Sequence, residues 1–478
     1  MKLSMTGPSK VGLALILLSG GFSILWGFSI GQNAPAGMVD FKAVYYGARC
    51  QIEHRDPYNE SEFLDVFRAD GGKFPAAPET ALLLRRAMPV CINLPTTLFL
   101  VTPFASLAWG PAHVLWTMLG AGCLLLAGFA SLNLAGNASQ GVSVFLICMV
   151  LANCEVIFSS GNIAGISVSL CVIAVWCFLK QRFVPAGVLC LAVSLLLKPH
   201  DAGLVWLYFL LAGAPYRKRA LQTLLLTMVL GLPAILWVSN VSPHWMQELH
   251  SNLQATSAHG DIRDPGPNAV SIHTPDMVID LQAAISIFKD DARFYDPATY
   301  IVCGALLLLW SVRTLRARFT PPRVWLALAA IVPLTMLITY HRPYDAKLLL
   351  LTVPACAMLW AEGGAMGRIG LLVNTAGIVL TGDIPLALLV RLSRKLHLGT
   401  AGIFGQILTV VMIRPASLIL LTMAIFYLCL YIRRNSLTDT GGCLKEAQGG
   451  AGEVGRARDE LAPTISADQR FSATHGVN

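Results

Sequence analysis

Long apolar runs, separated by short polar junctions, extend over most of this chain. A helix needs about 20 apolar residues to cross the roughly 30 Å hydrocarbon layer of a bilayer. Runs near that length lie at 11–30, 112–132, 142–158, 162–179, 220–238, 324–339 and 403–432, with weaker ones at 183–197, 201–213, 298–312, 348–361 and 369–390. Because lipid offers no partner to backbone amides, such segments form helices. The pattern predicts an all-α polytopic membrane protein with about 11–13 transmembrane helices.

Short basic junctions between these runs indicate how the chain is oriented, because Lys and Arg concentrate on the cytoplasmic side of membrane proteins. They gather in "KQR" at 180–182, "YRKR" at 216–219 and "RTLRARFTPPR" at 313–323. The opposite face then holds two large loops, 31–111 and 241–297, and three junctions, "SSGN" at 159–162, "KPHD" at 198–201 and "HRPYDAK" at 341–347. The basic "RLSRK" at 391–395 also falls on that outer face, so the topology of the last helices stays open.

One membrane domain with an extracytoplasmic cap is predicted. Residues 1–432 contain all the apolar runs, and loops 31–111 and 241–297 would build the cap. The assignment requires "LPTTLFLVTPFASLA" at 94–108 to be re-entrant or interfacial. The first apolar run lacks an obvious cleavage site, so we interpret it as a retained anchor. Residues 433–478 are polar and Gly-rich without apolar periodicity, and we predict a disordered tail there.

Composition agrees with a membrane protein and adds little chemistry. Of 478 residues, 55% are hydrophobic and 13% charged, too little polar surface for an ordinary soluble protein. The net charge of +8 follows the positive-inside pattern and indicates no nucleic-acid partner. Most of the twelve cysteines lie in apolar runs, and no spacing suggests a metal site. Cys50 and Cys91, both in the first loop, could form a disulfide or stay two free thiols.

A carboxylate stands just after the first apolar run leaves the bilayer, in "GMVDFKAVYYGARC" at 37–50. Asp40 gains nothing from snorkelling and is costly near hydrocarbon. It could cap a helix over 41–52, and a semi-buried carboxylate can also serve as a general base. The two roles are compatible. On such a helix Asp40 and Val44 share one face and Tyr45 and Arg49 another, and Tyr45 or Tyr46 would lie with Arg49 beside the acid.

The predicted topology gathers the unusual polar residues on the outer face. They are Asp40, Arg49, Asp56, Asn162, Lys198, His200, Asp201, His341, Arg342, Asp345 and Lys347. Interfacial snorkelling is the alternative explanation for each Lys and Arg. Cations at outer helix ends, such as Lys198, His341 and Arg342, can instead hold a phosphate. An acid beside such cations indicates group transfer from a phosphate-bearing donor, with Asp56 and Asp201 as the next candidate bases.

Three stretches resemble glycosyltransferase family 87. "VDFKAVYYGARCQIEHRDPYN" is similar to the Asp-Phe-x-x-x-Tyr-Tyr-x-Ala helix and Asp-Pro-Tyr turn with which that family begins. "SSGNIAGI" at 159–166 resembles its Gly-Gln/Asn junction, and "LLKPH" at 196–200 its Lys-Pro junction. Two positions depart from the pattern, since His54-Arg55 replaces the usual glycine before Asp-Pro-Tyr and Asn162 stands where glutamine is common. These departures concern the sugar and acceptor more than the reaction class.

The resemblance implies a GT-C fold enzyme that transfers a sugar, typically mannose, from a polyprenyl-phosphate donor. It implies that Asp40 is the general base and that basic residues such as Lys198 and His341 bind the donor phosphate. From the topology we add Arg342, Lys347, Arg49, Tyr45 and Asn162 as candidate substrate-binding residues. The expected partners are a polyprenyl-phosphate sugar, a glycolipid or glycan acceptor and membrane lipid, with inversion at the anomeric carbon and no metal or other cofactor. The expected location is the bacterial inner membrane, with the site facing outward.

A secondary transporter or flippase of a lipid-linked or small polar substrate is the main alternative. Such a protein places ionisable residues near the bilayer midplane, on broken helices in matched halves. Here only Glu155 and Asp383 are acids well inside apolar runs, and no two halves of the sequence match. The sequence therefore favours the transferase.

Overall fold

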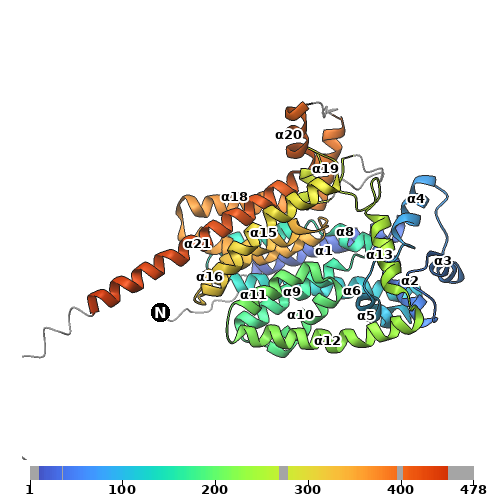
Figure 1. Ribbon diagram of the computed structural model, residues 1–478, viewed down its shortest axis with the longest axis horizontal. Helices are drawn as coiled ribbons and strands as arrows, with labels where there is room; N and C mark the ends of the chain where they lie inside the picture. The colour runs from blue at the N-terminus through green and yellow to red at the C-terminus, as the bar shows by residue number, and fades with distance from the viewer. Residues whose placement is uncertain (1–9, 35, 268–277, 396–401, 450–478) are drawn as a thin grey trace, which may run out of the picture. The chain divides into compact units, whose positions relative to one another are not determined.

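The computed structural model describes residues 10–34, 36–267, 278–395 and 402–449, and every regular element in these ranges is helical (Figure 1). The chain divides into two units, Met1–Tyr431 and Ile432–Asn478. The elements, in chain order, are α1 (Lys10–Asn33), α2 (Val39–Ile52), α3 (Glu60–Ala69), α4 (Pro78–Ala87), α5 (Pro95–Ala105), α6 (Trp109–Ala135), α7 (Gln140–Leu151), α8 (Glu155–Ser160), α9 (Ala164–Lys180), α10 (Val184–Leu197), α11 (Pro199–Leu211), α12 (Tyr216–Val241), α13 (Trp245–Thr256), α14 (Leu281–Ile285), α15 (Ala292–Arg316), α16 (Pro321–Ile338), the 3₁₀ helix η2 (Asp345–Thr352), α17 (Val353–Glu362), α18 (Gly364–Leu380), α19 (Asp383–Lys395), α20 (Gly402–Ile413) and α21 (Pro415–Gly449).

Seven of the described helical segments are long and apolar enough to cross a membrane, and an eighth candidate is the pair α18 and α19, which bend by 74° at their junction. The all-α polytopic class predicted from the apolar runs is therefore confirmed, but this number is below the expected 11–13. Several apolar runs fold as helices too short to span alone. At 1.5 Å per residue, the 17 residues of α9 reach only about 25 Å.

The short apolar helix α9 is covered by neighbouring helices. Most residues of α9 are buried, and α6 and α10 pack along it. Helices shielded in this way need not match the thickness of the hydrocarbon layer, because protein rather than lipid surrounds them.

The two large loops that were predicted to form the cap pack on each other. Loop 31–111 contains α2 to α5, and loop 241–297 contains α13 and α14. The Asn252 side-chain amide of α13 donates hydrogen bonds to the backbone carbonyls of Tyr58 (3.1 Å) and Cys91 (3.0 Å) in the first loop. Helix α5, expected to be re-entrant or interfacial, has 11 residues and cannot span the bilayer.

The start of α2 docks on the junction that follows α8. The Met38 amide donates to the Ser159 carbonyl at 2.7 Å, and Trp116 of α6 donates to the Gly161 carbonyl at 2.9 Å. Gly161 has φ +70°, and a Cβ there would lie 2.5 Å from the Cβ of Phe41, so only glycine allows this approach. The contact brings the beginning of α2 against residues 159–162.

The N-cap role predicted for Asp40 is wrong. Helix α2 begins at Val39, and its N-cap is Met38, whose backbone is left-handed with φ 57°. Asp40 lies in the first turn instead, where a negative charge still interacts favourably with the helix dipole. The side chain is therefore available for another partner.

Cys50 and Cys91 are both free thiols with no exposed surface. Of the two alternatives left open by the sequence, the structure has the unpaired one. At the C-terminal end, α21 continues to Gly449, beyond residue 433 where the polar tail was expected to begin. Leu, Lys, Glu, Ala and Gln are good helix formers, and they occupy 444–448. Residues 450–478 lie outside the described part of the chain.

Candidate active site

The Asp40 carboxylate accepts a hydrogen bond from Asn162, which follows the candidate membrane span Gln140–Ser160. The Asn162 side-chain amide donates a hydrogen bond of 2.8 Å to Asp40 Oδ2. The Asn162 side-chain oxygen in turn accepts from the Ala164 amide at 2.8 Å, which fixes the direction of the donating amide. Two of the predicted site residues thus meet, and Asp40 Oδ1 is left for another interaction.

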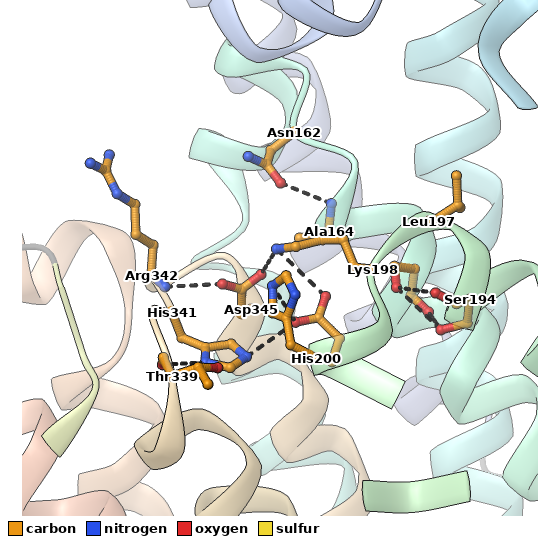
Figure 2. Close-up of polar contacts among 12 residues, drawn as sticks. Asn162, Ala164, Ser194, Leu197, Lys198, His200, Thr339, His341, Arg342 and Asp345 are labelled. Carbon is orange, nitrogen blue, oxygen red and sulfur yellow. Dashed lines mark hydrogen bonds and ion pairs between the residues drawn. The ribbon is translucent and has the colours of Figure 1, made fainter. Parts of the chain in front are cut away.

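A cluster of charged residues lies next to Asn162, where the α10–α11 junction meets the segment after α16 (Figure 2). Lys198 donates to Asp345 Oδ1 and lies 3.6 Å from Asp201 Oδ2. Asp345 Oδ2 accepts the backbone amide of Arg342 at 3.0 Å. The predicted gathering of the "KPHD" and "HRPYDAK" junctions is therefore confirmed.

His341 completes this cluster and is seen below Asp345 in Figure 2. Its Nδ1 lies 2.8 Å from the Thr339 carbonyl and its Nε2 lies 3.4 Å from Asp201 Oδ1. Burial lowers the pKa of His341, but Asp201 and Asp345 outweigh burial and the pKa is raised. Burial raises the pKa of Asp201, but Lys198, His200 and His341 reverse the effect and the pKa is lowered. The two shifts have one cause, because each group favours the charged form of the other.

The charges of Lys198 and His341 are matched by two carboxylates. Asp201 is 1% exposed and Asp345 2% exposed, and each lies against a cation. Burial lowers the pKa of Lys198, yet Asp201 and Asp345 raise it overall, so the ammonium stays charged. Both cations of the cluster are thus paired with buried carboxyl groups. This pairing limits the attraction that Lys198 and His341 offer to a phosphate.

Arg342 belongs to the same segment, but its guanidinium points away from Asp345 (Figure 2). It donates to the Ile262 carbonyl at 2.8 Å and lies 5.6 Å from the centre of the Tyr340 ring. Burial lowers the pKa of Arg342, but Tyr340, Tyr344 and the carboxylate of Asp40 raise it well above its usual range. Its charge thus acts on the space beside Asp40.

Tyr45 and Arg49 form a contact with the end of α5. The Tyr45 hydroxyl donates to the Leu107 carbonyl at 2.7 Å, and Arg49 donates to the Tyr45 hydroxyl at 3.3 Å. Arg49 also pairs with Glu53 at 3.1 Å. These polar groups join α2 to the 105–107 turn, on a different face of the helix from Asp40.

Lys347 is separate from the Lys198 cluster. It is 3% exposed, donates to the Pro343 carbonyl at 3.1 Å and pairs with Asp383 at 3.5 Å. Asp383 begins α19 after the bend in the α18–α19 pair. The sequence placed Lys347 with the other cations because it shares their junction, whereas η2 turns it toward another helix end.

Two groups among the described residues could hold a metal ion by geometry. They are His200, Asp201 and His341, and His259, Asp264 and Asp290, each with ligand atoms within 4.8 Å of one another. In the first group the Lys198 ammonium already neutralises Asp201 at 3.6 Å, which disfavours a second cation there. In the second, Asp264 accepts the Gly260 and Gly266 amides. We therefore propose no metal ion at either group.

Sequence reasoning missed Arg263. Its guanidinium lies 4.6 Å from the centre of the Tyr340 ring, on which Arg342 also lies. The signal was weak, because Arg263 stands in "GDIRDPGP" of the second loop, between two acids that would be expected to pair with it. Those acids have other partners.

Comparison with known proteins agrees with the resemblance drawn from the sequence motifs. Residues 92–273 match the family model of Glycosyltransferase family 87. No curated protein and no solved structure matches the chain significantly. The matched part contains Asn162 and Lys198, whereas Asp40 and the 339–347 segment lie outside it. The suspected family is thereby supported, and together with the apolar helices it indicates an integral membrane glycosyltransferase.

Proposed function

We propose that this membrane glycosyltransferase moves a sugar, mannose being the first choice, from a polyprenyl-phosphate donor to an acceptor hydroxyl. The acceptor would be a glycolipid or a glycan. The reaction would take place on the extracytoplasmic side of the bacterial inner membrane, beneath the cap built from the two large loops. The observation that carries the proposal is the Asn162–Asp40 hydrogen bond of 2.8 Å beside a cation-rich segment.

In this mechanism Asp40 is the general base. Its carboxylate takes the proton of the acceptor hydroxyl while that oxygen attacks the anomeric carbon. The bond between this carbon and the phosphate oxygen breaks, and the electron pair leaves with the polyprenyl phosphate. A single displacement inverts the anomeric centre. Asn162 supports the step by fixing one oxygen of the carboxylate, so that the other is directed at the acceptor.

The leaving phosphate gains negative charge as the bond breaks. The donor is a diester with one charge, and the product is a monoester that carries more. Cations beside the phosphate therefore stabilise the transition state more than the ground state, and this difference accelerates the reaction. Arg342, whose pKa is raised in part by the Asp40 carboxylate, supplies such charge close to Asp40.

The other candidate bases fit less well. Asp56 Oδ1 accepts the Tyr58 amide at 2.8 Å in the turn after α2, which is a structural role. Asp201 is buried between Lys198 and His341, and the lowered pKa makes its carboxylate a weak base. Asp40 is half-buried and has one oxygen free of the Asn162 bond. These observations favour Asp40.

A turnover assay tests the proposal. Membranes that contain the protein are given a radiolabelled short-chain polyprenyl-phosphate mannose, and both labelled product and released polyprenyl phosphate are measured. Asp40→Asn should lower turnover by about 10²–10⁴-fold. The matched control is Asp56→Asn, whose side-chain oxygen can still accept the Tyr58 amide and which should keep wild-type turnover.

Two results would contradict the proposal. Near-normal turnover in Asp40→Asn would remove Asp40 as the base. Movement of the intact donor across the membrane, with no release of polyprenyl phosphate by the wild type, would favour the alternative of a transporter or flippase.

A further inference from the structure

Two of the cations predicted to hold the donor phosphate, Lys198 and His341, are already paired with carboxylates. Lys198 lies between Asp345 and Asp201, and His341 lies 3.4 Å from Asp201. A phosphate that approached this cluster would meet buried carboxylates as well as cations. If a phosphate binds close to Asp40, the attraction has to come from cations that form no ion pair with a carboxylate.

Two guanidinium groups meet this requirement. Arg342 and Arg263 lie 5.6 Å and 4.6 Å from the centre of the same Tyr340 ring. Neither has a carboxylate within ion-pair distance among the described residues. The Nε atoms of both are buried and without a hydrogen-bond partner there. Like charges brought together in this way repel each other unless an anion joins them.

The acids nearest to Arg263 in sequence have other partners. Asp264 is 1% exposed and accepts the Gly260 amide at 2.7 Å and the Gly266 amide at 2.8 Å. Asp261 lies 4.0 Å from Arg86 of α4. Asp261 and Asp264 are therefore committed to the first loop and to the fold of their own loop, and among the described residues the Arg263 guanidinium has no ion-pair partner.

We propose that Arg263 and Arg342 form the phosphate-binding pair of this enzyme, with Tyr340 as the surface that holds both guanidiniums. This inference rests on the proposed function and specifies which residues hold the donor. Arg342 comes from the segment after α16 and Arg263 from the cap, so a bound phosphate joins the cap to the membrane domain. Lys198, Asp201, Asp345 and His341 then act as the neutral support that positions residues 339–345.

The planar guanidinium suits this task better than an ammonium. It presents parallel N–H donors that match two phosphate oxygens at once, and it stays charged at every accessible pH. Two such groups can hold the phosphate of the diester donor and the more highly charged monoester product. The same chemistry would bind the phosphates of a nucleoside diphosphate or inorganic phosphate, so the test has to separate these sources.

Binding to the purified full-length protein in detergent provides that test. Farnesyl phosphate is the probe, farnesol is the uncharged control ligand, and GDP and inorganic phosphate are the alternative anions. The variants are Arg263→Gln, Arg342→Gln and Arg263→Lys. Arg293→Gln, an exposed arginine of the same loop, is the matched control. Thermal unfolding of each variant is measured alongside, and Arg263→Lys retains the charge if the Gln variant fails to fold.

Removing one charged hydrogen-bonding partner should lower the affinity for farnesyl phosphate by roughly ten- to a hundredfold. We expect this loss in Arg263→Gln and Arg342→Gln, a smaller loss in Arg263→Lys, and wild-type affinity in Arg293→Gln. Farnesol binding should be the same in all variants. Increasing salt should lower the affinity of the wild type for farnesyl phosphate. The decrease should be smaller in the two Gln variants.

Failure of the inference and failure of the proposed function give different results. Unchanged farnesyl phosphate affinity in folded Arg263→Gln and Arg342→Gln would overturn the arginine pair and leave the lipid donor standing. A wild type that binds farnesyl phosphate no better than farnesol, but binds GDP or phosphate through the arginines, would support the pair and overturn the lipid donor. Absence of binding to every anion would overturn the pair.

Discussion

The Asn162 amide and the Asp40 carboxylate are joined by a hydrogen bond of 2.8 Å, although 122 residues separate them in the chain. The bond ties the first turn of α2 to the junction between α8 and α9. Because Asn162 is itself fixed by the Ala164 amide at 2.8 Å, the carboxylate is held from a rigid point at a helix start. A hydrogen bond to a charged group contributes about 1.5–3 kcal/mol.

Asn162→Leu should therefore lower kcat by about ten- to a hundredfold with little change in KM, because the misplaced base affects the chemical step more than donor binding. Asn162→Gln should recover most of the loss, since a longer amide can still donate to Asp40. Steady-state kinetics with a short-chain donor checks both variants. Wild-type kcat in Asn162→Leu would show that Asp40 needs no orientation from this junction.

The ion pair of Lys198 and Asp345 should be important for stability. Lys198→Met leaves the buried Asp345 carboxylate without its ammonium partner, and such a loss destabilises a protein by about 3–5 kcal/mol. The double variant Lys198→Met/Asp345→Asn should recover part of this, because it also removes the unpaired charge. The measurement is the free energy of unfolding from denaturant titration in detergent micelles.

The control for this cycle is Lys289→Met. Lys289 is 59% exposed and pairs with Asp291 at 3.6 Å on the surface, so its loss should cost no more than about 1 kcal/mol. If Lys198→Met were as stable as Lys289→Met, the cluster would not have the structural role assigned to it here. Equal losses in the single and double variants would place the effect outside the Lys198–Asp345 pair.

Much of the site could be predicted from the sequence because membrane topology restricts which helix ends can meet. The junctions of Asn162, Lys198 and His341 each follow an apolar run that was predicted to leave the bilayer on the same face, and the structure brings all three together. The acid at the start of α2 could be located for the same reason. The order of apolar runs and junctions along the chain was therefore sufficient to predict which helix ends meet.

The pairing of charges within the site could not be predicted in this way. Lys198 and Asp345 lie 147 residues apart, and only the packing of α11 against α16 brings them into contact. The composition of "KPHD" and "HRPYDAK" contained a hint, since each junction carries acids as well as cations. Lys347 was predicted to join the other cations because it shares their junction. The 3₁₀ helix η2 instead directs its side chain to Asp383. Arg263 lies in a loop without apolar periodicity, so the sequence does not indicate which way its side chain points.

Stability should depend on pH through His341. Burial works against its charge, but Asp201 and Asp345 raise its pKa above the unfolded value of 6.5. A group with a raised folded pKa contributes stability that is fully present below the unfolded pKa and is lost as the pH rises through the folded one. The unfolding midpoint should therefore fall as the pH increases above 6.5, and this slope should be smaller in His341→Gln. A slope that is equal in both proteins would assign the pH dependence to other groups.

Cys50 and Cys91 should remain reduced and unreactive in the folded protein. Both are fully buried, and burial raises the pKa of Cys91 to about 12 although hydrogen bonds from Asn93 lower it. Burial and the neighbouring Cys91 raise the pKa of Cys50 as well. Because the thiolate is the species that reacts, a maleimide added to native protein should leave both thiols unmodified. After denaturation without reductant both should be alkylated, as peptide mass spectrometry can measure. A Cys50–Cys91 linked peptide in the non-reduced digest would contradict this prediction and show that the oxidising compartment closes the bridge.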